Sequence, residues 1–210
     1  MDPSPVAADD RALTARGHAT RERILVAAAE VLAEHGELEV ALVAERAGVS
    51  DGLPYRYFGN RSGLVSAVVE DFHLRLAVAA VYADFEGATW QEREQQRVAA
   101  WVHFLFRDPL SPVMLAGLGG DAVVASSWQH RLSLAIEVGA RNIAAGQRAG
   151  DLPDDNDPRL LAAVVLGGVQ SAVAVALATR PRPSERSVRD ALWTFVRSAA
   201  EAVPDRRGSR

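Results

Sequence analysis

Apolar residues recur at spacings of three and four along most of the chain, and this periodicity predicts an all-α fold. The clearest case begins near Thr20 and ends at Gly36, with one apolar face made of Ile24, Leu25, Ala28, Val31 and Leu32. We expect helices over about 20–35, 40–47, 51–58, 60–76, 89–106, 121–149, 157–179 and 184–203, and a further helix start at 111–112. The alternating β-branched runs that indicate strands form no convincing set.

Helix-capping residues stand at most of the expected starts. A Ser, Thr, Asp or Asn at such a position accepts a hydrogen bond from a free amide of the first turn. Thr89 with Glu92 forms a capping-box pattern, and two pairs add proline at the first helical position. The predicted caps are Ser50, Asn60, Thr89, Ser111 before Pro112, Asp157 before Pro158, and Ser184.

One segment is apolar enough to raise the question of a membrane. The 20 residues between Arg159 and Arg180 carry no charge, a length that can span a bilayer. Their Ala, Gly and Val content, with Gln170 and Ser171 inside, favours a helix buried in a bundle. We therefore expect no membrane association and place a dimer seam here. Its residues are predicted to be Leu161, Val165 and Gly168, facing Val188, Leu192 and Phe195 of the last helix.

The composition removes several kinds of chemistry. The chain has no cysteine, and all 23 of its basic residues are arginine, so disulfides, thiolate sites and lysine nucleophiles are excluded. The net charge of −4 argues against a protein coated in basic surface. Without a basic stretch followed by an apolar one at the start, the expected location is the cytoplasm.

The most informative segment lies between two short expected helices. Ala47 is small where helices cross, Gly48 suits a left-handed turn, and Val49 can fill the core beneath it. The following helix carries Tyr55, Arg56 and Tyr57, a combination suited to phosphate and base-edge contacts in a major groove. This spacing predicts a helix-turn-helix; on spacing alone, an ordinary helical hairpin stays open as the alternative.

The stretches TRERILVAAAEVLAEHG and VAERAGVSDGLPYRYFGNRSGLVSAVVEDF resemble the DNA-binding domain of TetR-family transcriptional repressors. The resemblance covers about residues 17–77, and RAGDLPDDNDPRLLAAVVLGG is similar in style to the loop before the family's penultimate helix. It implies a three-helix DNA-binding domain at 17–77, an effector-binding and dimerisation domain at 78–204, and a homodimer on double-stranded operator DNA. Residues 1–16 and 205–210 are then an arm and a tail.

The resemblance also implies which residues contact DNA. Ser50 corresponds to the cap of the recognition helix and Tyr55 to a phosphate-contacting tyrosine. Departures are Leu38 and Glu39 in place of a capping Thr or Ser, Leu53 in place of Thr, Tyr57 in place of His, Arg61 in place of Lys, and Pro54 in the first helical turn. The predicted DNA-binding residues are Arg16, Arg21, Arg23, Ser50, Asp51, Gly52, Leu53, Tyr55, Arg56, Tyr57 and Arg61.

Charge in this domain is unusual for a DNA-binding protein. Residues 16–75 hold seven Arg against nine Asp and Glu, a net charge of −2, which predicts modest non-specific DNA affinity. The exception is residues 11–23, where four Arg face only Glu22. This arm either contacts DNA, as N-terminal arms do elsewhere, or is a solvated tail.

Other motif matches point to other functions and are weaker. Gly48–Gly52 fits the G-x-S-x-G hydrolase elbow, and Gly117–Ala122 fits G-x-G-x-x-A, but each of these motifs requires a preceding strand. The acidic run 154–157 lacks the glycine and distal glutamate of a calcium loop, and the five histidines lack metal-ligand spacing. We therefore expect no enzyme activity, no cofactor and no metal.

Aromatic residues concentrate in the middle helices. In a body that encloses an effector, as the resemblance implies, they predict an apolar cavity with a few polar groups and an apolar small-molecule ligand. The predicted lining is Phe72, Trp101, His103, Phe104, Leu105, Met114, Trp128, Leu132 and Gln170, with Gln129, Arg131 and Asn142 as further polar candidates. The expected function is a ligand-responsive transcriptional repressor; the alternative is a small helical carrier or enzyme that kept the DNA-binding domain without regulatory function.

Overall fold

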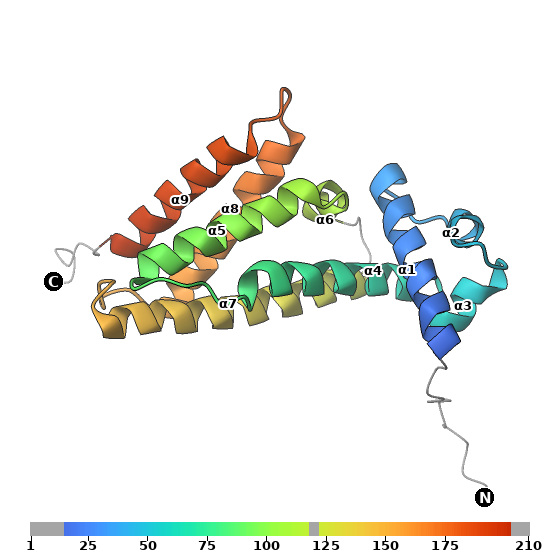
Figure 1. Cartoon of the computed structure of the whole chain (residues 1–210), viewed down its shortest axis with the longest axis horizontal. Helices are drawn as coiled ribbons and strands as arrows, with labels where there is room; N and C mark the ends of the chain where they lie inside the picture. The colour runs from blue at the N-terminus through green and yellow to red at the C-terminus, as the bar shows by residue number, and fades with distance from the viewer. Residues whose placement is uncertain (1–14, 118–121, 203–210) are drawn as a thin grey trace, which may run out of the picture.

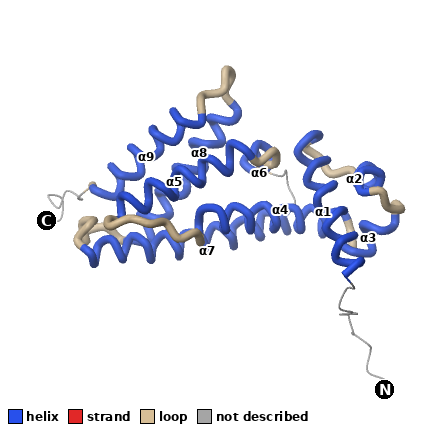
Figure 2. Tube along the Cα trace, viewed as in Figure 1, coloured by secondary structure: helices blue, strands red, loops and turns tan. Residues whose placement is uncertain are grey.

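A computed structural model describes the backbone of residues 15–117 and 122–202 and the side chains of all of these except 122–128. Within these ranges the regular elements are all helical, as the periodicity predicts (Figure 2). The helices form a small N-terminal head at one end and a larger elongated body (Figure 1). The helix start expected at Asp121 lies outside the described residues.

The head consists of α1 (Ala15–His35), α2 (Val40–Ala47) and α3 (Gly52–Phe58), packed against the start of α4 (Arg61–Leu76). Its centre is aliphatic, with Ile24, Val31, Val43, Leu64 and Val68 all at most 1% exposed. The first helix begins by Ala15, earlier than the apolar pattern predicts, because its first turns are polar and carry no periodic signal.

The fourth helix connects the head to the body. It leaves the head and runs along the body beside α7 (Figure 1). At its end, α4 continues into one π-helical turn, η1 (Ala77–Val81), where the Tyr82 amide donates to the Ala77 carbonyl over 2.8 Å. Such turns are rare and often occur at functional sites.

The body contains α5 (Trp90–Arg107), α6 (Ser111–Ala116), α7 (Ala122–Ala149), α8 (Pro158–Ala178) and α9 (Glu185–Glu201). The apolar helix α8 packs along α7 and α9. It is long and apolar enough to cross a membrane, yet only 33% of its most apolar window is buried within one chain. The remaining apolar surface therefore lies on the outside of a single subunit.

Most predicted caps are confirmed, and two are wrong. The side chains of Asn60, Thr89, Asp157 and Ser184 each accept a hydrogen bond from an amide three residues later. In the recognition helix α3, by contrast, the N-cap position is Asp51 without a side-chain bond, and Ser50 offers only its carbonyl, to the Leu53 amide. Ser111 is the first residue of α6 and is fully buried, so its hydroxyl does not cap the helix.

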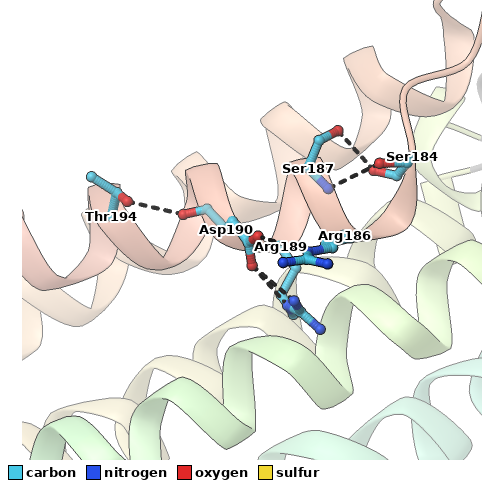
Figure 3. A network of polar contacts seen from close by, with 6 residues as sticks. All are labelled: Ser184, Arg186, Ser187, Arg189, Asp190 and Thr194. Atoms are coloured by element: carbon cyan, nitrogen blue, oxygen red, sulfur yellow. Dashed lines mark hydrogen bonds and ion pairs between the residues drawn. The ribbon is translucent and has the colours of Figure 1, made fainter.

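The last helix has a polar network along its first turns. Ser184 accepts from the Ser187 amide at 3.1 Å, and Asp190 pairs with Arg189 at 2.9 Å and with Arg186 at 3.6 Å (Figure 3). The ion pairs are exposed and add little stability. The cap satisfies an amide that has no partner within the helix.

We therefore expect Ser184→Ala to lower the free energy of unfolding by about 1 kcal/mol. Denaturant unfolding measures this change. Ser198→Ala, at an exposed position inside α9, is the matched control and should be neutral or slightly stabilising, because it removes a hydroxyl that caps nothing and alanine has the higher helix propensity. Equal losses in both variants would contradict a capping role for Ser184.

Candidate DNA-binding face and effector cavities

The turn between α2 and α3 has the geometry of a helix-turn-helix. Gly48 adopts a left-handed conformation (φ 64°), as predicted, and its amide donates back to the Glu45 carbonyl. Val49 donates to the Ala44 carbonyl and packs against the core. Glu39 stands at the N-cap of α2 and makes no side-chain cap, consistent with the departure noted there in the sequence. These contacts fix the direction in which α3 leaves the turn.

The outer surface of α3 presents two of the predicted DNA contacts most openly. Tyr55 is 48% exposed and Arg56 is exposed. Among the residues that the structure describes, Arg56 has no hydrogen-bond or ion-pair partner, so its guanidinium is available to a ligand. Ser50, Asp51 and Gly52 are exposed at the start of the helix. Leu53 and Tyr57 are half-buried and pack partly against the core, so each offers only part of its side chain to DNA.

Other arginines of the head have partners inside the protein. Arg46 pairs with Glu34 at 2.7 Å, which lowers the pKa of that carboxyl through the hydrogen bond, and Arg21 lies over the Phe58 ring at 5.0 Å. Arg61 donates from Nε to the Leu38 carbonyl at 2.8 Å, which fastens the start of α4 to the loop before α2. Arg16 and Arg23 are exposed on α1, and Arg11 lies outside the described residues.

Arg61→Ala is therefore expected to have two effects. Loss of the bond to Leu38 should lower the free energy of unfolding by about 1 kcal/mol. If the exposed end of the guanidinium also binds phosphate, the slope of log affinity against log salt should become shallower by about one. Denaturant unfolding and a salt titration of DNA binding measure the two effects separately. An unchanged salt slope would leave Arg61 with the structural role alone.

The body contains two internal cavities that share a wall. The first, here called the α4 cavity, has a volume of about 60 Å³. It is lined by Phe72, His73, Leu76, Ala77, Val81, Tyr82, Trp101, Leu105, Leu115, Arg131, Leu132, Ala135 and Gln170. The wall is largely apolar, and five of these residues belong to α4 or η1. This cavity therefore adjoins the helix that enters the head.

The second cavity, here called the α8 cavity, has a volume of about 50 Å³ and is lined mainly by residues of α5, α7 and α8. Its lining is Val81, Trp90, Glu94, Arg97, Val98, Trp101, Ala135, Val138, Gly139, Asn142, Ile143, Ala162, Val165, Leu166, Val169 and Ala200. Val81, Trp101 and Ala135 line both cavities. At about 10–15 Å³ per water, each has room for only a few waters, so a larger ligand requires side chains to move.

Polar groups of the two cavities differ in charge. Burial, with the nearby Arg131, lowers the pKa of His73 to about 4, so the imidazole beside the α4 cavity is neutral at neutral pH. Arg131 is 36% exposed and lies 3.8 Å from the Glu70 carboxylate. In the α8 cavity, Glu94 accepts from Arg97 Nε at 3.1 Å, and burial raises the pKa of Glu94.

The predicted effector residues are only partly brought together. The α4 cavity is lined by six of them: Phe72, Trp101, Leu105, Arg131, Leu132 and Gln170. Asn142 lines the α8 cavity instead. Three other residues lie outside both linings. Phe104 packs against Phe72 at 5.4 Å and faces an outer groove, Met114 is buried in the core, and His103 is exposed and bonded to Glu185 at 2.9 Å. The Trp128 side chain lies outside the described residues, and Gln129 is exposed.

Sequence patterns missed most of the α8 cavity. Glu94 and Arg97 are spaced like an ordinary surface pair on a helix that opens with a capping box, so nothing in the sequence marks them as buried. Gly139 and Gly146 give a weak signal, because α7 has small residues where it approaches Ala162 and Trp90. Prediction of this site required the position of α5 relative to α8.

The outer side of α8 and α9 carries an open apolar groove. It is lined by Gly168, Ala172, Ala176, Ser187, Val188, Ala191, Leu192 and Phe195. Four of the predicted dimer residues are therefore here, with the Phe195 ring against Gly168. The other two are not on this surface: Val165 lines the α8 cavity, and Leu161 packs against the core. The exposed apolar positions are instead Leu160, Val164 and Val175.

The helical surroundings exclude the hydrolase interpretation of Gly48–Gly52, because Ser50 follows a helix and not a strand. Among the described residues, no group of three or more His, Asp or Glu side chains is placed to hold a metal ion. What remains is an exposed recognition helix joined by α4 to a body with internal cavities. This is the architecture of a helix-turn-helix DNA-binding regulator.

Comparisons with known proteins agree with this class. Residues 24–68 match the family model described as bacterial regulatory proteins of the tetR family. The chain is 28% identical over 191 residues to the HTH-type transcriptional regulatory protein RaaS of Mycobacterium tuberculosis, covering 87% of this chain and 84% of that protein. Residues 24–68 are therefore similar to the DNA-binding domain of TetR-family regulators, and the chain as a whole is similar to a transcriptional regulatory protein.

Solved structures share the fold over most of the chain. A TetR-family regulator from Rhodococcus superposes with a TM-score of 0.76 at 21% identity, covering 87% of this chain and 99% of that one. The regulator FadR of Bacillus subtilis, solved in complex with stearoyl-CoA, gives a TM-score of 0.69 at 18% identity, covering 87% and 99%. At these identities the likeness concerns the fold.

Proposed function

We propose that this protein is a homodimeric repressor that binds operator DNA through α3 and releases it when a small molecule occupies the body. The observation that carries the proposal is the path of α4. Its first residue is bonded to the head through Leu38, and its last turns, with η1, form one wall of the α4 cavity. A ligand in that cavity therefore touches the helix that positions the head.

The body holds α4 at a second point. Arg75 on α4 pairs with Asp71 at 2.7 Å and with Asp108, which is 7% exposed and lies between α5 and α6. Asp108 also accepts from the Leu110 amide at 2.9 Å. Displacement of α4 by a ligand thus strains the ion pair between the partly exposed Arg75 and the buried Asp108, and it also strains α6, which contacts α1 of the head. Effector and operator are coupled if each binds a different position of α4 more tightly.

Dimerisation supplies the second half of the proposal. The apolar groove of α8 and α9, with Leu160, Val164 and Val175 beside it, leaves an apolar surface open on a lone subunit, and such surfaces often mark protein–protein interfaces. Pairing with the same surface of a second copy buries it in a two-fold symmetric four-helix arrangement. Two heads related by this symmetry bind two half-sites of a near-palindrome.

Footprinting with the purified full-length protein tests the proposal. On DNA from the region upstream of its own gene, we expect two protected half-sites related by approximate two-fold symmetry. A small molecule that raises the melting temperature should weaken this protection, because it binds one conformation of the folded protein preferentially. Ligands that stabilise the protein without any effect on DNA binding would contradict the proposed coupling.

A further inference from the structure

The α8 cavity has one charged acceptor in a wall that is otherwise mostly apolar. Glu94 projects from α5 among residues of α7 and α8, and its side chain is 15% exposed. A carboxylate has about four acceptor sites on its two oxygens. The hydrogen bond from Arg97 Nε uses one of them.

Arg97, which lines the same cavity, divides its donors between Glu94 and the end of η1. Its Nη1 group donates to the carbonyls of Ala80 and Val81 at 2.7 and 3.1 Å, and its guanidinium lies 4.9 Å from the centre of the Phe85 ring. The positive charge is therefore shared with the end of η1. Burial raises the pKa of Glu94 despite the opposing effects of Arg97 and Arg93. The two arginines therefore do not fully offset the free-energy cost of burying the ionised carboxylate.

Aromatic rings complete this environment. Trp90 and Trp101 both line the α8 cavity with Glu94. The face of an indole attracts cations, and the attraction grows when water is excluded. A carboxylate that lines an apolar cavity together with two indoles is suited to an organic cation.

The α4 cavity has no carboxylate in its lining. His73 is neutral there at neutral pH, and Arg131, the one charged side chain among its lining residues, lies 3.8 Å from the Glu70 carboxylate. Since Trp101 belongs to both walls, rotation of its ring would join the two cavities into one elongated space. An apolar group fits the α4 end and a charged group the α8 end.

We propose that the effector is an organic cation: an amine or quaternary ammonium on an apolar body, with its charge against Glu94 between Trp90 and Trp101 and its body reaching past Trp101 to α4. This inference rests on the proposed function, because it names the ligand class of the same cavities. It adds a positive charge to the apolar small-molecule ligand that the sequence predicts.

Three probes of equal chain length test the charge preference on the unmodified protein: decyltrimethylammonium, decanoate and neutral decanol, each titrated calorimetrically below its micelle concentration. We expect the cation to bind at least about tenfold more tightly than either of the others. Glu94→Gln should weaken cation binding by about tenfold and leave decanoate unchanged or slightly tighter. Glu94→Asp, which keeps the charge, should retain most of the affinity.

Glu70→Gln is the matched control, because it removes a carboxylate near the cavities that is 60% exposed; it should change cation binding by less than about twofold. Equal binding of the three probes, tighter binding of decanoate, no binding of any probe, or an unaffected Glu94→Gln variant would overturn the inference. DNA binding without probe, measured on the same samples, separates this failure from failure of the regulator proposal.

Discussion

Replacement of Arg56 with Ala is expected to weaken specific DNA binding by about 1–3 kcal/mol for each half-site, which is about a fivefold to 150-fold loss per half-site. Arg56 is exposed in the middle of α3 and has no partner within the described part of the chain. Its planar fork can pair with the O6 and N7 atoms of guanine, which no other side chain of α3 can do. Sequence preference should therefore relax at one position of each half-site.

Fluorescence anisotropy with a set of single-base operator variants measures both effects. Arg141→Ala is the matched control, because Arg141 is an exposed arginine on α7 and its loss changes the net charge equally. Tyr55→Phe gives a second comparison: if Tyr55 contacts phosphate, binding to all sequences should weaken alike. An Arg56→Ala variant that loses affinity but keeps its full sequence preference would assign Arg56 to the DNA backbone.

Replacement of Val175 with Asp should convert the dimer to a monomer and abolish operator binding at concentrations where the unmodified protein binds. Val175 is 66% exposed in a single subunit, so the carboxylate costs the monomer little. In the proposed dimer the same carboxylate is buried without a partner, which costs several kcal/mol. Operator affinity falls with it, because one head contacts only one half-site.

Light scattering at micromolar concentration measures the mass, and circular dichroism checks that the helices persist. Val78→Asp is the control: Val78 is 62% exposed on η1, away from α8 and α9, and its replacement should leave a dimer. A Val175→Asp protein that remains dimeric would place the interface elsewhere. Loss of helical structure in this variant would show that Val175 supports the subunit itself.

The head was predictable from sequence because its signals are local. Gly48 allows the left-handed turn, Asn60 caps the first turn of α4, and the apolar spacing of α1 determines its buried face. Each of these signals depends on residues only a few positions apart. The failed caps show the limit of such signals. Ser111 has the right sequence context, but burial of α6 in the body decides its surroundings.

The body was less predictable because its helices are apolar on more than one side. Two neighbouring valines of α8 show this: Val164 is exposed, whereas Val165 lines the α8 cavity. Composition does not distinguish them. The same holds for Glu94, whose spacing to Arg97 is typical of a solvated pair. Its burial follows from the packing of α5 against α7 and α8, which depends on residues far apart in the chain.

We expect the protein to bind DNA sequence-specifically despite a head with a net charge of −2 over residues 16–75. The most direct measurement is competition binding at physiological salt, without added ligand, between upstream DNA of its own gene and random DNA of equal length. The best upstream fragment should bind at least about a thousandfold more tightly. Equal affinity for this fragment and random DNA would show that the protein is not a sequence-specific regulator.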